Sequence, residues 1–486
     1  MPDLKILFIT SEIFPLIKTG GLADVSAGLP PALSKLGAET RILLPAYLPA
    51  VQKMKSLKTL DTPRLAHDAT ILEGKLPGTK LTIWLVDIPK YFTRIGNPYT
   101  TEEGNDWPDN AQRFTAFNQI ALEISQNRAN LDWPPDIVHC NDWQTGLIPA
   151  LLAKEVTRPA TIFTIHNLAY MGLFSWNTFE ELGLPHDLWD MDKMEFHGQF
   201  AFIKGGLSAA DHITTVSPTY AQEVQTSEFG YGLEGLLQAR SHQMSGILNG
   251  IDHTLWNPAT DKLIDHNYSK TKLSSKLKNK TSLQTHFALP PKKAIPLLVT
   301  VGRIVEQKGY DLLIKALPEL MLMDIQIALL GSGDKYLETQ LIAAAQEHPE
   351  KLSVRIGYDE VLAHKMEAGA DVFLMPSKFE PCGLNQLYSL KYGTIPIVNP
   401  VGGLADSIID IKPNPAKATG IYLTQSSPEA LIQAVETTVN LFHNPPQWQK
   451  LIKTAMSQDF SWKNSAKQYL TLYKTVLKNR QSTANK

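Results

Sequence analysis

The chain has few cysteines, no long apolar segment and no excess of charge of one sign. Cys140 and Cys382 are its only cysteines, which excludes a disulfide framework and the close spacing of a zinc or redox motif. No apolar run approaches the roughly 18 residues that a membrane-spanning helix needs. A net charge of −2 excludes the basic surface typical of nucleic-acid-binding proteins. The sequence therefore predicts a globular protein with neither nucleic acid nor a membrane as partner.

The first residues also lack the features of a leader. Lys5 is the only early positive charge, and Ser11-Glu12 interrupts the apolar stretch that follows it, unlike a secretory signal. No segment rich in serine and arginine precedes the first apolar run, which argues against import into a plastid. Together with the scarcity of cysteine, these features predict a reducing, cytoplasmic location.

A length of 486 residues exceeds the size at which one hydrophobic core stops growing, so we expect two domains. Short β-branched and aliphatic runs alternate with longer helical patterns, which predicts doubly wound parallel sheets. The series begins again after the Asn-Gly turn near residue 250, where we place the junction. The first series of runs is 6–9, 41–44, 81–86, 137–139, 161–165 and 213–216, and the second is 297–301, 325–330, 352–356, 372–375, 395–398 and 421–423.

Residues 20–24 and 402–406 spell the same segment, Gly-Gly-Leu-Ala-Asp. Each copy follows an apolar run, so each predicts a strand, a glycine-rich turn and a helix start whose N–H groups face phosphate or sugar oxygens. Lys18 precedes the first copy and is suited to neutralise a diphosphate. The structural alternative is a simple turn, with Lys18 solvated and Asp24 capping the helix. Two such turns predict two nucleotide-binding halves facing a shared cleft.

Two cations and a carboxylate follow strands of the second series. Arg303 and Lys308 come after one apolar run, at the strand end where ligands bind, and two cations offset the charge of a departing diphosphate. Glu380 follows another run and is suited to accept hydrogen bonds from sugar hydroxyls, while the N–H groups of residues 383–385 open a helix toward an anion. Salt bridging and helix capping are the structural alternatives.

Three further side chains end apolar runs. His166 and Asp142 close two neighbouring runs of the first series, and Tyr358 follows a run of the second. Clefts open at the carboxyl ends of parallel strands, so these positions predict contact with a sugar or stacking on a base. Each is weak evidence alone, because a single histidine is more often structural than catalytic.

The chain contains, in order, Lys18-Thr19-Gly20-Gly21-Leu22-Ala23-Asp24, Thr164-Ile165-His166-Asn167-Leu168-Ala169-Tyr170, Leu248-Asn249-Gly250-Ile251-Asp252, Gly302-Arg303 with Gln307-Lys308-Gly309, and Phe379-Glu380-Pro381-Cys382-Gly383-Leu384. These motifs closely resemble those of the bacterial glycogen synthase and plant starch synthase family. The resemblance runs over nearly the whole chain, from residue 5 to about residue 475.

This resemblance implies a GT-B fold, an α/β architecture in which two Rossmann-like domains with doubly wound parallel sheets face a deep cleft. We expect an N-terminal domain of residues 1–248 with 458–486 and a donor-binding domain of residues 249–457. The amphipathic pattern of residues 461–477 fits a C-terminal helix that crosses back onto the first domain, because its apolar side must be buried.

The resemblance also implies the reaction, in which glucose passes from ADP-glucose to the non-reducing end of an α-1,4-glucan such as glycogen, starch or maltodextrin, with retention of anomeric configuration. It implies no cofactor and no metal. Lys18, His166, Arg303, Lys308 and Glu380 fall on catalytic positions. Carried over by position, the expected donor-binding residues are Lys18, Gly20, Gly21, Asp24, Asp142, His166, Asn249, Arg303, Lys308, Tyr358, Glu380, Cys382, Gly383 and Leu384, and the expected acceptor-binding residues are Tyr99 and Asp106.

Two positions depart from the family pattern. The family usually has His-x-His-Asp-Trp where this chain has His139-Cys140-Asn141-Asp142-Trp143, which puts any role of the second histidine in doubt. Asn385 stands where threonine is common, and both side chains form hydrogen bonds. Neither departure removes a charge that we expect at the chemical centre.

Alternatives remain at the level of sequence. Retention arises either by same-face attack assisted by the leaving phosphate, which we favour, or through a covalent intermediate on Glu380. A related retaining transferase that uses a UDP- or GDP-sugar is the second enzymatic hypothesis. A dehydrogenase is disfavoured because neither half has a clear Gly-x-Gly-x-x-Gly, and a non-catalytic glucan-binding protein would not need paired cations beside a carboxylate.

Overall fold

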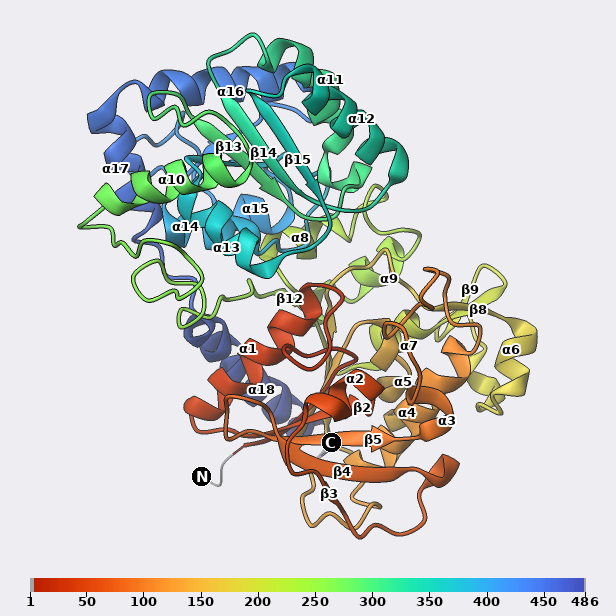
Figure 1. The fold of residues 1–486 in the computed structure, drawn as a ribbon. Helices are drawn as coiled ribbons and strands as arrows, with labels where there is room; N and C mark the ends of the chain where they lie inside the picture. Colours follow the sequence, from red (N-terminus) through yellow and green to blue (C-terminus); the bar gives the residue numbers. More distant parts are fainter. Residues whose placement is uncertain (1–3, 485–486) are drawn as a thin grey trace. The chain divides into compact units, whose positions relative to one another are not determined.

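The computed structural model describes the backbone of residues 4–484 and side chains as far as Arg480. Its contacts divide the chain into two compact units (Figure 1). The first unit contains the residues up to Gly250 and those from Trp462 onward, and the second is Ile251–Ser461. The expected boundaries fall within a few residues of these divisions. Each unit contains its own parallel sheet, in agreement with the predicted GT-B fold class.

One large sheet forms the centre of the first unit. Within the described residues its strands run in the order β12-β11-β7-β6-β1-β2-β5-β4-β3, parallel from β12 to β5 and antiparallel beyond. The nine strands are β1 (Lys5–Ile9), β2 (Glu39–Pro45), β3 (Lys58–Thr59), β4 (Thr70–Lys75), β5 (Thr82–Asp87), β6 (Ile137–Asn141), β7 (Ala160–Ile165), β11 (His212–Thr215) and β12 (Met244–Gly246).

The six strands predicted for this half are present, and the sequence patterns missed the remaining ones. β4 is a half-buried strand near the edge that carries Glu73, Gly74 and Lys75, so it lacks the apolar run of a central strand. A small antiparallel sheet was also missed because its strands are only two or three residues long. Its order is β8 (Leu173–Ser175), β10 (Gln199–Ala201) and β9 (Glu195–Phe196).

The second unit has an entirely parallel sheet, and all six of its described strands coincide with predicted runs to within about two residues. The order is β15-β14-β13-β16-β17-β18, which is the 3-2-1-4-5-6 order of a Rossmann fold. The strands are β13 (Leu297–Val301), β14 (Gln326–Gly331), β15 (Leu352–Ile356), β16 (Val372–Met375), β17 (Ile395–Val398) and β18 (Ile421–Tyr422).

Helices connect the strands, as parallel pairing requires. The first unit contains α1 (Gly21–Lys35), α2 (Leu48–Lys53), α3 (Pro89–Phe92), α4 (Asn110–Ser125), α5 (Leu147–Leu152), α6 (Trp176–Glu181), α7 (Phe202–Ala209), α8 (Pro218–Glu223), α9 (Glu234–Ala239) and α18 (Trp462–Ala484). The second contains α10 (Ser274–His286), α11 (Tyr310–Leu320), α12 (Lys335–Glu347), α13 (Glu360–Gly369), α14 (Asn385–Tyr392), α15 (Gly402–Ser407), α16 (Pro428–Phe442) and α17 (Pro445–Ala455). The short 3₁₀ helices are η1 (Ala66–Asp68), η2 (Trp143–Thr145), η3 (His186–Leu188), η4 (Ser241–Gln243) and η5 (Glu306–Lys308).

Each sheet has one position where the direction of winding reverses. In the first unit the chain proceeds outward from β1 to β2 and β5 and then resumes at β6 on the other side of β1. In the second unit the same reversal separates β13 from β16. Loops that leave the carboxyl ends of such a pair diverge and leave a crevice, which is where open α/β sheets bind ligands.

The last helix completes the core of the first unit. Figure 1 shows α18, in blue, beside α1, in red, and Trp462, Tyr469 and Tyr473 of α18 belong to the same buried cluster as residues of α1 and of the central strands. Trp462 lies so close to Gly28 of α1 that a Cβ on Gly28 would be 1.9 Å from the indole Nε1. Only glycine therefore permits this contact.

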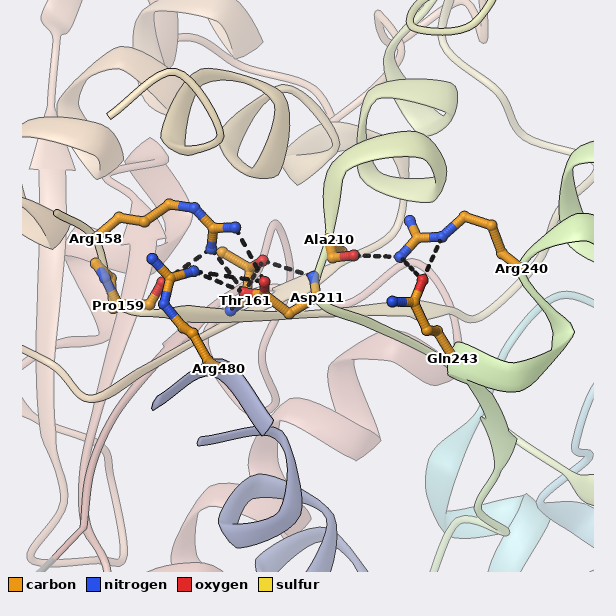
Figure 2. Close-up of polar contacts among 8 residues, drawn as sticks. All are labelled: Arg158, Pro159, Thr161, Ala210, Asp211, Arg240, Gln243 and Arg480. Atoms are coloured by element: carbon orange, nitrogen blue, oxygen red, sulfur yellow. Dashed lines mark hydrogen bonds and ion pairs between the residues drawn. The ribbon is translucent and has the colours of Figure 1, made fainter. Parts of the chain in front are cut away.

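Polar contacts hold the far end of α18. Figure 2 shows Asp211, which directly precedes β11, receiving hydrogen bonds from the Arg158 guanidinium at 2.6 and 3.0 Å and contacts at 3.4 and 3.5 Å from Arg480 of α18. Nearer the centre, the Tyr473 hydroxyl hydrogen-bonds with His139 Nδ1 of β6 at 2.7 Å. The C-terminal helix thus contacts the strand that leads to Asp142.

A buried ion pair joins the start of the second unit to α13 and α14. His364 Nδ1 lies 2.8 Å from Asp261 Oδ2, and the same oxygen accepts a hydrogen bond from the Tyr392 hydroxyl at 2.5 Å. The Trp256 ring stacks on the His364 ring at 3.7 Å. Burial lowers the pKa of His364, but the hydrogen bonds and charges of Asp261 and Glu360 outweigh it and raise the pKa to about 9.

Among the described helices, none is long and apolar enough to cross a membrane.

Replacing Trp462 by alanine is expected to destabilise the first unit by about 3–5 kcal/mol, because it leaves a cavity against Gly28 and removes a large buried ring. Differential scanning calorimetry measures this as a lower transition temperature. Lys467→Ala, on the exposed side of the same helix, serves as the control and is expected to change little. Equal transition temperatures for the two variants would contradict the packing argument.

The His364–Asp261 pair predicts a pH-dependent stability. A pKa raised from 6.5 to about 9 corresponds to about 3 kcal/mol, present below pH 6.5 and lost as the pH rises through 9. The stability difference between the wild type and His364→Gln is therefore expected to be constant at acidic pH and to shrink between pH 6.5 and 10. His443→Gln, an exposed histidine of the same unit, controls for the loss of a histidine. Urea unfolding across this range checks the trend, and a pH-independent difference would refute it.

Candidate active site

The loop after β1 is held by a buried carboxylate. Glu12 accepts hydrogen bonds from the backbone N–H and hydroxyl of Thr19, the latter at 2.6 Å, and from the Gly20 N–H at 3.1 Å. Glu12 is 3% exposed, and these donors compensate for its loss of solvent. In this structure the Gly20 N–H donates to Glu12, and its contact with a ligand oxygen stays a prediction.

Lys18 and Asp24 form an ion pair at the edge of this loop. Lys18 Nζ lies 2.9 Å from Asp24 Oδ1, and both side chains are partly exposed. Asp24 lies in the first turn of α1, which begins at Gly21. The negative charge thus stabilises both the helix N-terminus and the ammonium. Of the expected donor-binding residues in this loop, Lys18 is the one with a charge and an accessible side chain suited to an anion.

Tyr99 supports the same loop from the other side. Its hydroxyl donates to Glu12 Oε1 at 2.6 Å and hydrogen-bonds with Ser11 Oγ at 2.8 Å. Burial, with the nearby Glu12 charge, raises the pKa of Tyr99 well above its usual value. The hydroxyl is therefore occupied within the protein, and the contact of Tyr99 with the acceptor stays a prediction. Asp106, the other expected acceptor residue, is exposed in the loop that follows.

Two residues near Tyr99 also have structural partners. Arg113 is 1% exposed and donates to the Pro98 carbonyl at 2.9 Å, while the Asn110 side-chain amide donates to the Tyr99 carbonyl at 3.0 Å. The backbone of residues 98–99, next to the expected acceptor residue Tyr99, is thus held by α4.

Asp142 and His166 lie together at the ends of β6 and β7. Asp142 Oδ1 accepts hydrogen bonds from the backbone N–H groups of His166 at 2.7 Å and Asn167 at 3.3 Å. Burial raises the pKa of Asp142 to about 7, the two N–H groups oppose this rise, and the charge of Glu12 adds to it. Asp142 has φ 57° and ψ −179°, a conformation that only glycine adopts readily. Backbone strain of this kind is typical of functional sites.

The His166 ring is neutral. Its Nε2 hydrogen-bonds with Asn141 Oδ1 at 2.9 Å, and burial lowers the pKa of His166 to about 3. The neighbouring Trp143 is buried edge-on against Phe114, with ring centroids 5.0 Å apart. Asn249, 6% exposed near the end of the first unit, has an Oδ1 without a hydrogen-bond partner among the described residues, so it is available to a ligand donor.

In the second unit the loops after β13 and β16 meet at the reversal point. Lys308 Nζ forms an ion pair with Glu380 Oε2. This oxygen also accepts a hydrogen bond from the Ser377 hydroxyl at 3.1 Å. Gly309 permits this contact, since it has φ 76° and a Cβ there would lie 2.1 Å from the Pro376 carbonyl oxygen. Glu380 is 6% exposed, whereas the Lys308 side chain remains about a quarter exposed.

The turn after Glu380 offers backbone donors. The N–H groups of residues 383–385 have no acceptor among the described residues, and they open α14. Cys382 is buried and forms no disulfide. Asn385, where the family has threonine, donates its side-chain amide to the Val301 carbonyl at 2.7 Å and so fixes the helix start to β13.

The second Gly-Gly-Leu-Ala-Asp copy has a different role from the one we expected. The Gly403 N–H donates to the Glu380 carbonyl at 3.0 Å and lies within reach of the Pro381 carbonyl at 3.2 Å. A Cβ at Gly403 would be 2.1 Å from the Cys382 carbonyl oxygen. This copy therefore supports the turn after Glu380 from behind, and its N–H is not free for phosphate.

Arg303 and Tyr358 are the exposed members of the second-unit set. Arg303 follows Gly302 at the end of β13, and its guanidinium lies 3.5 Å from Gln307 Oε1. Tyr358 follows β15, is 70% exposed and hydrogen-bonds with Glu360. The described residues contain no group of three or more histidine, cysteine or acidic side chains placed to hold a metal ion.

The two halves of the chain match two family models. Residues 5–239 match the model described as the starch synthase catalytic domain, and residues 283–457 match that of glycosyl transferases group 1. Glycogen synthase 1 of Methylococcus capsulatus is 52% identical over 98% of this chain and 97% of its own length. Glycogen synthase of Thioalkalivibrio sulfidiphilus is 49% identical over 98% of this chain and its full length. The chain belongs to the glycogen and starch synthase family.

Its activity follows from this membership over the full length. The chain is a glucosyltransferase that transfers glucose from ADP-glucose to an α-1,4-glucan. The solved catalytic domain of starch synthase IV from Arabidopsis thaliana, bound to ADP and acarbose, superposes with a TM-score of 0.88 at 33% identity, covering 98% of this chain and all of that one. A sucrose-phosphate synthase from Thermosynechococcus elongatus, with a TM-score of 0.60 at 18% identity, shares the fold.

Sequence reasoning missed the partners that hold the site residues. Glu12 and Ser377 each lie a few residues from a recognised motif, but neither is part of a motif that we singled out. The best available signal for Glu12 was an acidic residue interrupting an apolar stretch directly after the first predicted strand. Such a residue must find donors or remain solvated, and here it finds the glycine loop.

Replacing Glu12 by glutamine is expected to lower kcat/KM for ADP-glucose about 10-fold or more. The amide has one acceptor oxygen and no charge, so it cannot accept all the donors that both carboxylate oxygens accept, and hydrogen bonds to charged groups are worth about 1.5–3 kcal/mol. Initial-rate kinetics measure the change. Glu103→Gln, an exposed carboxylate of the same unit, is the control. If both variants match the wild type, Glu12 does not position the loop.

Proposed function

We propose that the loops at the reversal points of both sheets bind one ADP-glucose molecule and transfer its glucosyl group, with retention, to the non-reducing end of an α-1,4-glucan such as glycogen or maltodextrin. The observation that carries this proposal is the common placement of the candidate residues. Lys18, Asp142 and His166 follow β1, β6 and β7, and Lys308 and Glu380 follow β13 and β16, at or beside the reversals.

The second unit supplies the groups suited to a diphosphate. Lys308 and Arg303 are cations at the end of β13, and the N–H groups of residues 383–385 lie at the start of α14. Negative charge on the leaving ADP grows as the bond to the anomeric carbon breaks, and a donor aimed at that charge contributes about 3 kcal/mol. Lys18, from the first unit, is suited to the same diphosphate.

The environment of Glu380 favours same-face attack over a covalent intermediate. Its carboxylate is already paired with Lys308 and accepts a hydrogen bond from the Ser377 hydroxyl. These contacts stabilise the negative charge and so reduce the nucleophilicity of the oxygen that would have to attack. A carboxylate held in this way is suited to orient sugar hydroxyls, and the leaving phosphate is then the base for the incoming glucan hydroxyl.

The first unit presents groups suited to the sugar. His166 is neutral, Asp142 is fixed by two N–H groups, and the Asn249 amide oxygen has no donor in the described part of the chain. Exposed Tyr358 of the second unit is suited to lie against the nucleobase. Both cysteines are buried and neither forms a disulfide, which fits the proposed cytoplasmic location.

Incorporation of labelled glucose tests this function and its alternative, a UDP- or GDP-sugar transferase. With maltodextrin as acceptor, we expect ADP-glucose to be preferred, and β-amylase to release the label as maltose, since addition is at the non-reducing end through an α-1,4 bond. Lys308→Ala is expected to lower kcat about 100- to 1,000-fold. Lys315→Ala, an exposed lysine of α11, is the control. Preference for UDP-glucose or GDP-glucose, or label resistant to β-amylase, would refute the proposal.

A further inference from the structure

Asn141 is the residue at which this chain departs from the family's second histidine, and its side chain is completely buried at the end of β6. The amide nitrogen donates to the Ile9 carbonyl at 2.9 Å and lies 3.4 Å from the His139 carbonyl. A carbonyl oxygen only accepts hydrogen bonds, so these contacts fix which end of the amide is nitrogen. The Asn141 oxygen must therefore face the other way.

That oxygen determines the proton position on His166. Asn141 Oδ1 lies 2.9 Å from His166 Nε2, and because an amide oxygen cannot donate, Nε2 carries the hydrogen. A neutral imidazole carries one N–H, which leaves Nδ1 with a lone pair. Burial lowers the pKa of His166 to about 3, so the ring does not take a second proton near neutral pH.

The remaining contacts of His166 are consistent with a fixed acceptor. Its backbone N–H donates to Asp142 Oδ1 at 2.7 Å, so consecutive residues after β6 hold both the ring and the backbone of His166. Nδ1 has no hydrogen-bond partner among the described residues. The titratable groups near the ring are Asp142, engaged by two N–H groups, and His139, which is buried and uncharged with a pKa of about 3.

We infer that Asn141 is a positioning residue that fixes His166 as the Nε2–H tautomer, so that Nδ1 accepts a hydrogen bond from a hydroxyl group of the transferred glucose. A histidine at position 141 could either donate or accept a hydrogen bond, so it would not determine which ring nitrogen of His166 carries the hydrogen. The inference rests on the proposed function in one respect, that His166 faces the sugar.

The tautomer is measured without any substrate. In ligand-free protein labelled with ¹⁵N-histidine, long-range ¹H–¹⁵N correlation spectra are expected to show His166 protonated at Nε2 and not at Nδ1, with His166→Gln used to assign the signal. In Asn141→Leu the spectrum is expected to show a mixture of the two His166 tautomers in place of the Nε2–H tautomer alone. Asn118→Leu, which removes another fully buried asparagine of the same unit whose hydrogen bonds go to backbone groups, is expected to leave the His166 signal unchanged.

The contact with the sugar is measured with ADP-glucose analogues that each lack one hydroxyl. One analogue is expected to lose about 10-fold in kcat/KM with the wild type, and this penalty is expected to vanish in Asn141→Leu, because the acceptor is no longer presented. If the loss in kcat/KM from the missing hydroxyl and the loss from Asn141→Leu are additive for every analogue, the assignment is overturned. An Nδ1–H tautomer of His166 in the wild type would also overturn it. The tautomer of His166 in the wild type is measured without the Asn141→Leu variant, so the inference can be refuted even if that variant misfolds. Failure of the wild type to use ADP-glucose would refute the proposed function while the tautomer result stands.

Discussion

Parallel strands place all their carboxyl ends at one edge of a sheet, and the reversal of winding leaves one crevice there. In this chain the reversals lie between β1 and β6 and between β13 and β16. The catalytic candidates follow these strands or, in the case of His166, the neighbouring strand β7. The sheets therefore set where chemistry is possible, and the loops supply the groups that perform it.

Three buried carboxylates illustrate how these loops are kept in place. Glu12 is held by backbone and hydroxyl donors, Asp142 by backbone N–H groups, and Glu380 by an ammonium and a hydroxyl. Each would be costly to bury alone, because a charge loses its hydration without compensation. Each is instead a point at which a flexible loop is attached to rigid structure, so the site is organised before a ligand arrives.

The sequence predicted six of the nine strands in the first central sheet and all six in the second, because strands buried on both faces are continuous apolar runs. β4 lies near an edge and was missed, since Glu73, Gly74 and Lys75 break its pattern. Tyr99 could be singled out from the family resemblance, but not the direction of its hydroxyl, which depends on Glu12 far away in sequence. The same is true of Gly403, whose N–H is taken by the Glu380 carbonyl.

The site residues were recognisable as motifs because glycines and charges after apolar runs are local signals. Their partners are tertiary, and no periodicity reveals them. Asn141 illustrates both what the sequence reveals and what it does not. Its departure from the family pattern was visible in the sequence, but the orientation of its amide required the Ile9 carbonyl and the His166 ring to be placed around it.

The contribution of α18 to the first unit has a consequence for biosynthesis. The ribosome makes all of Ile251–Ser461 before Trp462, so the apolar face of α1 and the pocket beside Gly28 stay uncovered while the second unit is being translated. The second unit is contiguous and can complete its folding first. The first unit, whose strands are translated first, therefore completes its core only when the last helix has been made, and until then the apolar face of α1 stays exposed.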